Sequence, residues 1–142
     1  IKENKIMSRS ESREAAFMLL FENMFRNEDP DDIIDTAVVA DLFDISDDAD
    51  KLFRSVWEKR DELAAVIDKY SEKRQFSRIP KVSAAVLEIA IYESLYDDKV
   101  PVNVAISEAV ILAKKYAMEP DVKFVNGLLS SFAGDIAKKE DK

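Results

Sequence analysis

The sequence predicts an all-α fold. Its composition is 47% hydrophobic and 35% charged, with only two glycines and four prolines among 142 residues. Such a chain is poor in residues that form turns and rich in residues that favour helices. Its length allows one domain that buries about two thirds of its unfolded surface around a single core. We therefore expect one helical domain over residues 8–138, held together by packing.

Capping residues and apolar spacing define the expected helices. Ser8 and Glu11 have the spacing of a capping box. Asp29 and Pro30 supply an N-cap and a first helical position, and Pro80 suits another helix start. Between these signals apolar side chains recur every three or four residues. We expect helices over residues 9–26, 30–42, 48–70, 82–96 and 102–116, and a last helix that begins near residue 121.

The last expected helix contains both glycines of the chain, Gly127 and Gly134. Glycine in a helix interior costs roughly 1 kcal/mol relative to alanine. We expect Gly127 to let this helix press its backbone against a neighbouring helix. Gly134 lies nearer the end, so fraying or a weaker close contact is its expected explanation.

Several kinds of chemistry are excluded by residues that the chain lacks. It has no Cys and no His, which removes thiolate catalysis, cysteine–zinc sites and the commonest general base. Its acidic runs do not have the D-x-D-x-D-G pattern of a calcium loop. Carboxylate pairs such as Asp97 and Asp98 fall in expected helix-capping segments. We expect no cofactor, no metal and no enzymatic activity.

No apolar run approaches the roughly 20 residues that span a bilayer, and no secretory signal is evident. We expect a cytoplasmic protein without a membrane partner. The first seven residues are interpreted as a cloning remnant or a disordered N-terminus, with Met7 as the natural start. Residues 139–142 are expected to form a charged tail.

The net charge of −8 argues against a nucleic-acid partner, because phosphate binding relies on Lys and Arg. The charge is unevenly distributed, however. Residues 1–68 contain 9 basic and 18 acidic side chains, whereas residues 69–142 contain 12 and 11. The second half therefore leaves room for a local basic face.

Three segments resemble a known family. The run AAVLEIAIYE, followed by VPVNVAISEAVILAKKYAMEPDVKFVNGLL, has the order and spacing of the C-terminal signature of the NusB family of bacterial transcription antitermination factors. The opening SRSESREAAFMLLF resembles the arginine-rich start of that family. The resemblance implies an all-α, NusB-like bundle of about six to seven helices in two packed sub-bundles.

The resemblance also implies a function. Proteins similar to NusB pair with the ribosomal protein NusE, and together they hold boxA RNA. Their complex helps RNA polymerase to pass terminators, chiefly in ribosomal RNA operons, without catalysis and with RNA rather than DNA as the ligand. A non-catalytic helical protein-interaction module that does not bind RNA remains an open alternative.

The resemblance places RNA-binding residues at the starts of the first and last helices. Arginine makes bidentate contacts to phosphate, and a partly exposed aromatic ring can stack on an unpaired base. Arg9 and Arg13 are four residues apart, so we expect them to project from the same side of their helix. The basic connection before Pro80 is a further hypothesis. The RNA-binding candidates are Arg9, Arg13, Lys123, Phe124, Arg74 and Arg78, with Lys73 and Lys81 beside the last two.

Contact with a NusE-like partner is expected on exposed residues of the central helices. The segment 82–96 is apolar on nearly every face, which predicts a helix surrounded by other helices. The few side chains of this segment that carry a polar group supply the candidates for partner contact. Glu88 stands where the family pattern has arginine. The partner-binding candidates are Ser83, Glu88 and Tyr92.

Overall fold

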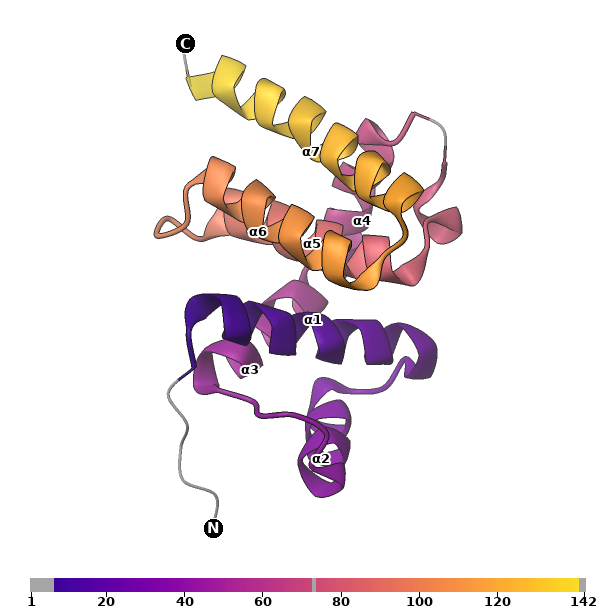
Figure 1. Ribbon diagram of the computed structural model, residues 1–142, viewed down its shortest axis with the longest axis vertical. Helices are drawn as coiled ribbons and strands as arrows, with labels where there is room; N and C mark the ends of the chain where they lie inside the picture. Colours follow the sequence, from indigo (N-terminus) through magenta and orange to yellow (C-terminus); the bar gives the residue numbers. More distant parts are fainter. Residues whose placement is uncertain (1–6, 73, 141–142) are drawn as a thin grey trace. The chain divides into compact units, whose positions relative to one another are not determined.

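The computed structural model describes residues 7–72 and 74–140 (Figure 1). In this part of the chain there are seven α-helices, one 3₁₀ helix and no strand, which confirms the all-α expectation. Residues 1–6 of the supposed N-terminal remnant, Lys73 of the basic connection and residues 141–142 of the tail lie outside the described residues. No described helix has the length and apolar character needed to cross a membrane.

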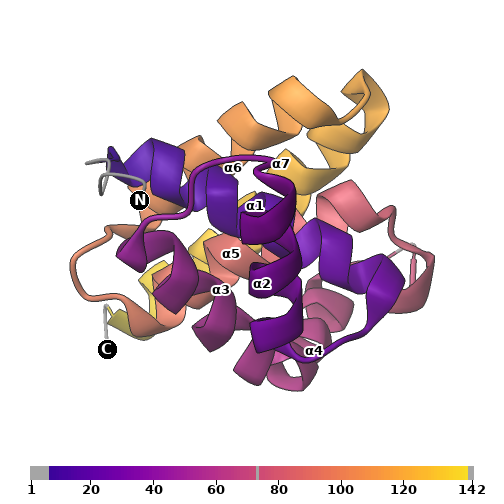
Figure 2. The same ribbon diagram turned by 90° about the horizontal axis from the view of Figure 1, so that it is seen from below.

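The chain divides into two compact units, Ile1–Lys59 and Arg60–Lys142. In the first unit three helices pack against one another (Figure 2). The predicted capping box is present, since the backbone N–H of Glu11 donates to Ser8 Oγ and the N–H of Ser8 donates to Glu11 Oε1, each at 3.1 Å. The helices are α1 (Arg9–Arg26), α2 (Pro30–Ala40) and α3 (Asp47–Glu58).

Both α1 and α2 end at a left-handed residue that is not glycine. Asn27 has φ 50° and ψ 49°, and Asp41 has φ 52° and ψ 43°. Asn and Asp enter this region more readily than other residues with a side chain, although glycine is the usual choice at this position. The chain therefore uses neither of its glycines at these helix ends.

In the second unit, α5 packs against α4, α6 and α7, and α7 also packs against α4 and α6. Residues 83–91 of α5 are all buried, as expected for a helix that is apolar on nearly every face. A short 3₁₀ turn, η1, lies between α4 and α5. The elements are α4 (Arg60–Tyr70), η1 (Phe76–Arg78), α5 (Lys81–Tyr96), α6 (Val102–Tyr116) and α7 (Glu119–Glu140).

Two expected helix boundaries are wrong. The predicted long helix over residues 48–70 is interrupted at Lys59, where φ is −99° and ψ is 14°. Apolar side chains recur on both sides of this residue, so their spacing did not reveal the break. The last helix begins at Glu119 and includes Pro120 in its first turn. Proline is tolerated there because the first N–H groups of a helix have no intrahelical acceptor.

Candidate nucleic-acid interface

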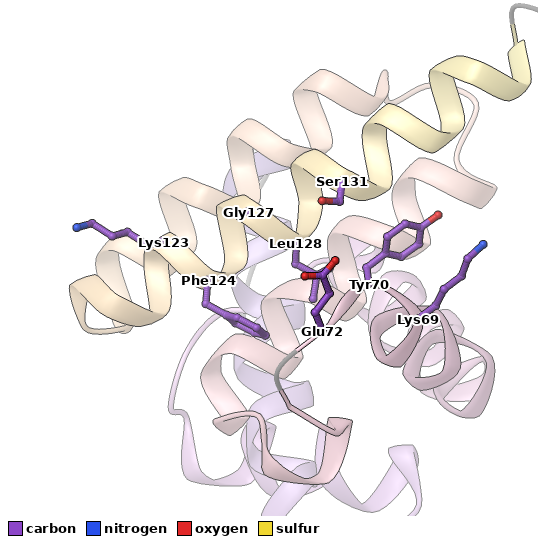
Figure 3. Close-up of a pocket in the computed structure, with 8 residues that line it drawn as sticks. All are labelled: Lys69, Tyr70, Glu72, Lys123, Phe124, Gly127, Leu128 and Ser131. Atoms are coloured by element: carbon purple, nitrogen blue, oxygen red, sulfur yellow. The ribbon is translucent and has the colours of Figure 1, made fainter.

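A cavity of about 330 Å³ lies between the C-terminal end of α4 and the N-terminal half of α7, within the second unit (Figure 3). Its lining combines aromatic rings, two lysines, a carboxylate and small residues. From α4 and the residues that follow it come Lys69, Tyr70 and Glu72, and from α7 come Lys123, Phe124, Gly127, Leu128 and Ser131.

Helical spacing explains why α7 contributes a continuous wall to this cavity. Gly127 and Leu128 lie three and four residues after Phe124, and Ser131 lies three residues after Leu128, so these residues share one face of the helix. Leu128 is buried, Phe124 is half-buried, and Gly127 and Ser131 are exposed. The wall therefore runs from the packed interior to the solvent.

The ring of Phe124 is in contact with a cation from a distant segment. The Arg74 guanidinium carbon lies 5.2 Å from the ring centroid, and Arg74 Nη1 lies 3.7 Å from Asp121 Oδ1. A cation–π contact at an exposed site contributes roughly 0.5–1 kcal/mol. The structure thus brings together Phe124 and Arg74, two RNA-binding candidates from separate parts of the sequence.

Tyr70 forms a fixed wall of the cavity. Its hydroxyl donates a hydrogen bond to Asp135 Oδ2 at 2.6 Å, and its ring meets Phe132 edge-on with centroids 5.7 Å apart. The bond to the carboxylate, together with burial, raises the pKa of Tyr70 to about 12, and the same bond lowers the pKa of Asp135. The Tyr70 hydroxyl proton is therefore already engaged at neutral pH.

Exposed cations lie at the cavity and elsewhere in the second unit. Lys123 has a side chain that is 77% exposed, and its contact with Glu119 is long, at 3.9 Å between Nζ and Oε1. Such a surface ion pair contributes little and competes weakly with a phosphate. Lys69 and Arg78 are also exposed. In the described residues no group of three or more carboxylates could hold a metal ion.

Comparison with known proteins identifies the family. The model of the NusB family matches residues 10–134. This chain belongs to the NusB family. NusB proteins are non-catalytic transcription antitermination factors, in agreement with the expectation that the chain is not an enzyme.

Curated NusB antitermination proteins are similar over nearly the whole chain. Those of Pseudothermotoga lettingae and Ruminiclostridium cellulolyticum are 34% and 36% identical over 140 and 136 residues. Each alignment covers 94% of this chain, and 96% and 94% of the respective relative.

Solved NusB structures share the fold. The NusB of T. maritima superposes with a TM-score of 0.80 at 32% identity, covering 92% of this chain and 93% of that one. A chain from a structure of NusB and NusE in complex with double-stranded RNA gives a TM-score of 0.75 at 27% identity. It covers 87% of this chain and 93% of its own length.

The two N-terminal arginines implied by the NusB resemblance differ in exposure. Arg9 is exposed, whereas Arg13 is only 4% exposed. The reason is that the buried part of α1 begins at Ser12, one turn after Arg9. Both arginines belong to the first unit. Their contact with RNA remains a prediction.

The partner-binding candidates on α5 are less exposed than expected for residues that contact a NusE-like partner. Ser83 is fully buried, Glu88 is 3% exposed and Tyr92 is half-buried, because α5 is apolar on nearly all sides and is covered by its neighbours. Among the described residues, Ser83 Oγ and Glu88 Oε1 have no hydrogen-bond partner. The expected exposure is therefore wrong for Ser83 and Glu88, and a partner role remains a prediction for all three.

Sequence reasoning missed the α4 side of the cavity and one residue of α7. No binding role was expected from the sequence for Lys69, Tyr70, Glu72 or Ser131. Their place in the cavity depends on packing between α4 and α7, which are far apart in the chain. The available signal was weak: Ser131 interrupts the apolar stripe four residues after Gly127.

Proposed function

We propose that this NusB-family chain is a cytoplasmic transcription antitermination factor that binds boxA-type RNA together with the ribosomal protein NusE. In this role it promotes processive transcription of ribosomal RNA operons within an RNA polymerase antitermination complex. Family membership and similarity to the NusB chain solved with NusE and double-stranded RNA support the proposal.

The observation that carries the proposal is the contact between Phe124 and Arg74 at the edge of an open cavity. A half-buried ring can stack on an unpaired base, while guanidinium and ammonium groups can bind the adjoining phosphates. Lys123 directly precedes Phe124 in the sequence, and its side chain is exposed.

The proposed RNA contacts fall into two groups. Arg74, Arg78, Lys123 and Phe124 belong to the second unit, and Arg9 belongs to the first. Arg13 must first be uncovered before it can reach a phosphate. For the NusE contact on α5 we favour Tyr92, since Ser83 and Glu88 are buried.

Binding of labelled boxA RNA tests this function. We expect the protein with NusE to bind boxA RNA more tightly than a scrambled RNA of equal length and composition. Phe124→Ala should weaken boxA binding about 5- to 150-fold, since stacking on an aromatic ring contributes roughly 1–3 kcal/mol per base. Phe25→Ala is the matched control, because Phe25 is a 65% exposed ring on α1 that is not among the proposed RNA contacts.

Two outcomes would count against this function. If boxA and scrambled RNA bind equally well, with and without NusE, the proposal fails and the protein-interaction module gains support. If Phe124→Ala and Phe25→Ala have equal effects on boxA affinity, RNA contact at Phe124 is refuted.

A further inference from the structure

Gly127 has no structural explanation within the protein. Glycine destabilises a helix interior relative to alanine, and neither glycine has a positive φ. A Cβ placed on Gly127 would have no neighbouring heavy atom within 4 Å, so the expected close approach of another helix is wrong. Gly134 has no close neighbour either. Glycine is absent from the ends of α1 and α2, where Asn27 and Asp41 adopt the left-handed conformation instead.

The empty space beside Gly127 belongs to the cavity between α4 and α7. Figure 3 shows Gly127 on α7 between Phe124 and Ser131. A methyl group at this position would extend from the helix into the cavity. Its absence allows a flat ligand to approach the backbone of α7 closely.

The remaining walls fit a single aromatic ligand. The volume of about 330 Å³ lies at the lower end of the range for small-molecule sites, roughly 300–1,000 Å³. Phe124 and Leu128 supply apolar surface, and Tyr70 is held in place by its bond to Asp135. Two lysine side chains complete the lining, where their ammonium groups can bind phosphates on either side of a base.

Glu72 contributes a carboxylate to the lining, and a carboxylate discriminates between the bases. A carboxylate repels phosphates, but it can accept two parallel hydrogen bonds. The Watson–Crick edge of guanine presents two adjacent donors, N1–H and the 2-amino group. Adenine and cytosine place an acceptor nitrogen beside their amino group, and uracil has one N–H between two carbonyls. Only guanine therefore satisfies both carboxylate oxygens.

We propose that this cavity binds one unpaired guanine of the RNA, with Glu72 accepting from its Watson–Crick edge and Gly127 leaving room for its ring. This inference rests on the proposed RNA binding, and it adds the identity of one base and the residues that select it.

Short RNA probes test the selectivity for guanine. We use oligouridine carrying one central guanosine, inosine or adenosine, with boxA RNA as the reference, and measure binding to the full chain with and without NusE. Inosine lacks the 2-amino group, so we expect it to bind about 10- to 150-fold more weakly than guanosine, which corresponds to one lost hydrogen bond to a charged group. Adenosine should bind more weakly still.

Glu72→Gln should abolish the difference between guanosine and inosine, because an amide presents one acceptor and one donor to the same edge. Glu58→Gln is the matched control, since Glu58 is exposed on α3 and the change in charge is identical. The control should retain the preference for guanosine.

The substitution Gly127→Ala distinguishes an effect on ligand binding from an effect on helix stability. Both Gly127→Ala and the control Gly134→Ala should raise the denaturation midpoint, because alanine favours the helix and meets no protein atom at either site. Only Gly127→Ala should weaken binding of the guanosine probe, by about tenfold or more. Gly134 does not line the cavity.

The outcomes distinguish this inference from the proposed function. If boxA RNA binds specifically but the guanosine and inosine probes bind equally, the guanine site is refuted and the function stands. Unchanged binding by both Gly127→Ala and Glu72→Gln refutes the site as well. If boxA RNA binds no better than scrambled RNA, the function itself fails.

Discussion

Burial of Glu88 gives the protein a specific dependence on pH. The residue is 3% exposed, and burial raises its pKa from the ordinary 4.5 to about 8, although the positive charge of Arg60 opposes the shift. Between these two values the folded protein retains a proton that the unfolded chain has released. The contribution of Glu88 to stability is therefore fully present below about pH 4.5 and is lost as the pH rises to about 8.

Glu88→Gln should remove this dependence. In the wild type the free energy of unfolding should fall by up to about 1.4 kcal/mol per pH unit between about pH 5 and pH 8 from this group alone. Because glutamine does not titrate, the variant should show a flatter profile in urea unfolding curves measured at pH 5, 6, 7 and 8. Glu58→Gln, at an exposed site, should follow the wild type. Parallel profiles for Glu88→Gln and the wild type would contradict the assignment.

The sequence predicted some binding residues of the candidate site, but it did not predict the contacts between them. Phe124 and Arg74 were each predicted, the first from the family resemblance and the second from a basic connection. Their contact depends on the end of α4 packing against α7, which brings residues 50 positions apart to 5.2 Å. No local pattern encodes such a contact. The burial of Arg13 could not be predicted from the sequence, because i, i+4 spacing defines a shared face but not which side of the helix is covered.

At the scale of the element, prediction succeeded where the signal is local. The start of α1 is set by Ser8 and Glu11 through bonds spanning only three residues, so it can be read from the sequence. The interruption at Lys59 has no proline, glycine or N-cap to mark it. It falls at the boundary between the two units.

The start of α3 depends on one serine with two bonds. Ser46 Oγ accepts the N–H of Ala49 at 3.0 Å and lies 2.7 Å from Ser12 Oγ on α1. Ser46→Ala removes the cap and deprives the buried Ser12 hydroxyl of this partner. We expect it to cost about 1–3 kcal/mol in the free energy of unfolding, measured by urea denaturation. Ser8→Ala, at an exposed cap, should cost only about 1 kcal/mol. Equal losses would show that the bond to Ser12 contributes nothing.

At the scale of the whole molecule, charge opposes RNA binding. The first unit contains 8 basic and 15 acidic side chains in its sequence, and the second contains 13 and 14. Beyond the Debye length of about 10 Å at 0.1 M salt, most of this charge is screened. Attraction for RNA must therefore come from the few cations close to the phosphates, and Lys123 and Arg74 are the cations that we propose for this role.

Lys123→Gln should change the salt dependence of RNA binding, whereas Lys51→Gln should not. Both substitutions remove one positive charge from an exposed helical site, and Lys51 lies on α3 in the acidic first unit. For single-stranded RNA, each phosphate contact contributes about −0.7 to the slope of log K against log salt concentration. Titrations of boxA RNA between 50 and 200 mM salt should therefore give a slope shallower by about 0.7 for Lys123→Gln alone. If both variants lower the affinity equally without changing the slope, net charge explains the effect and Lys123 does not contact a phosphate.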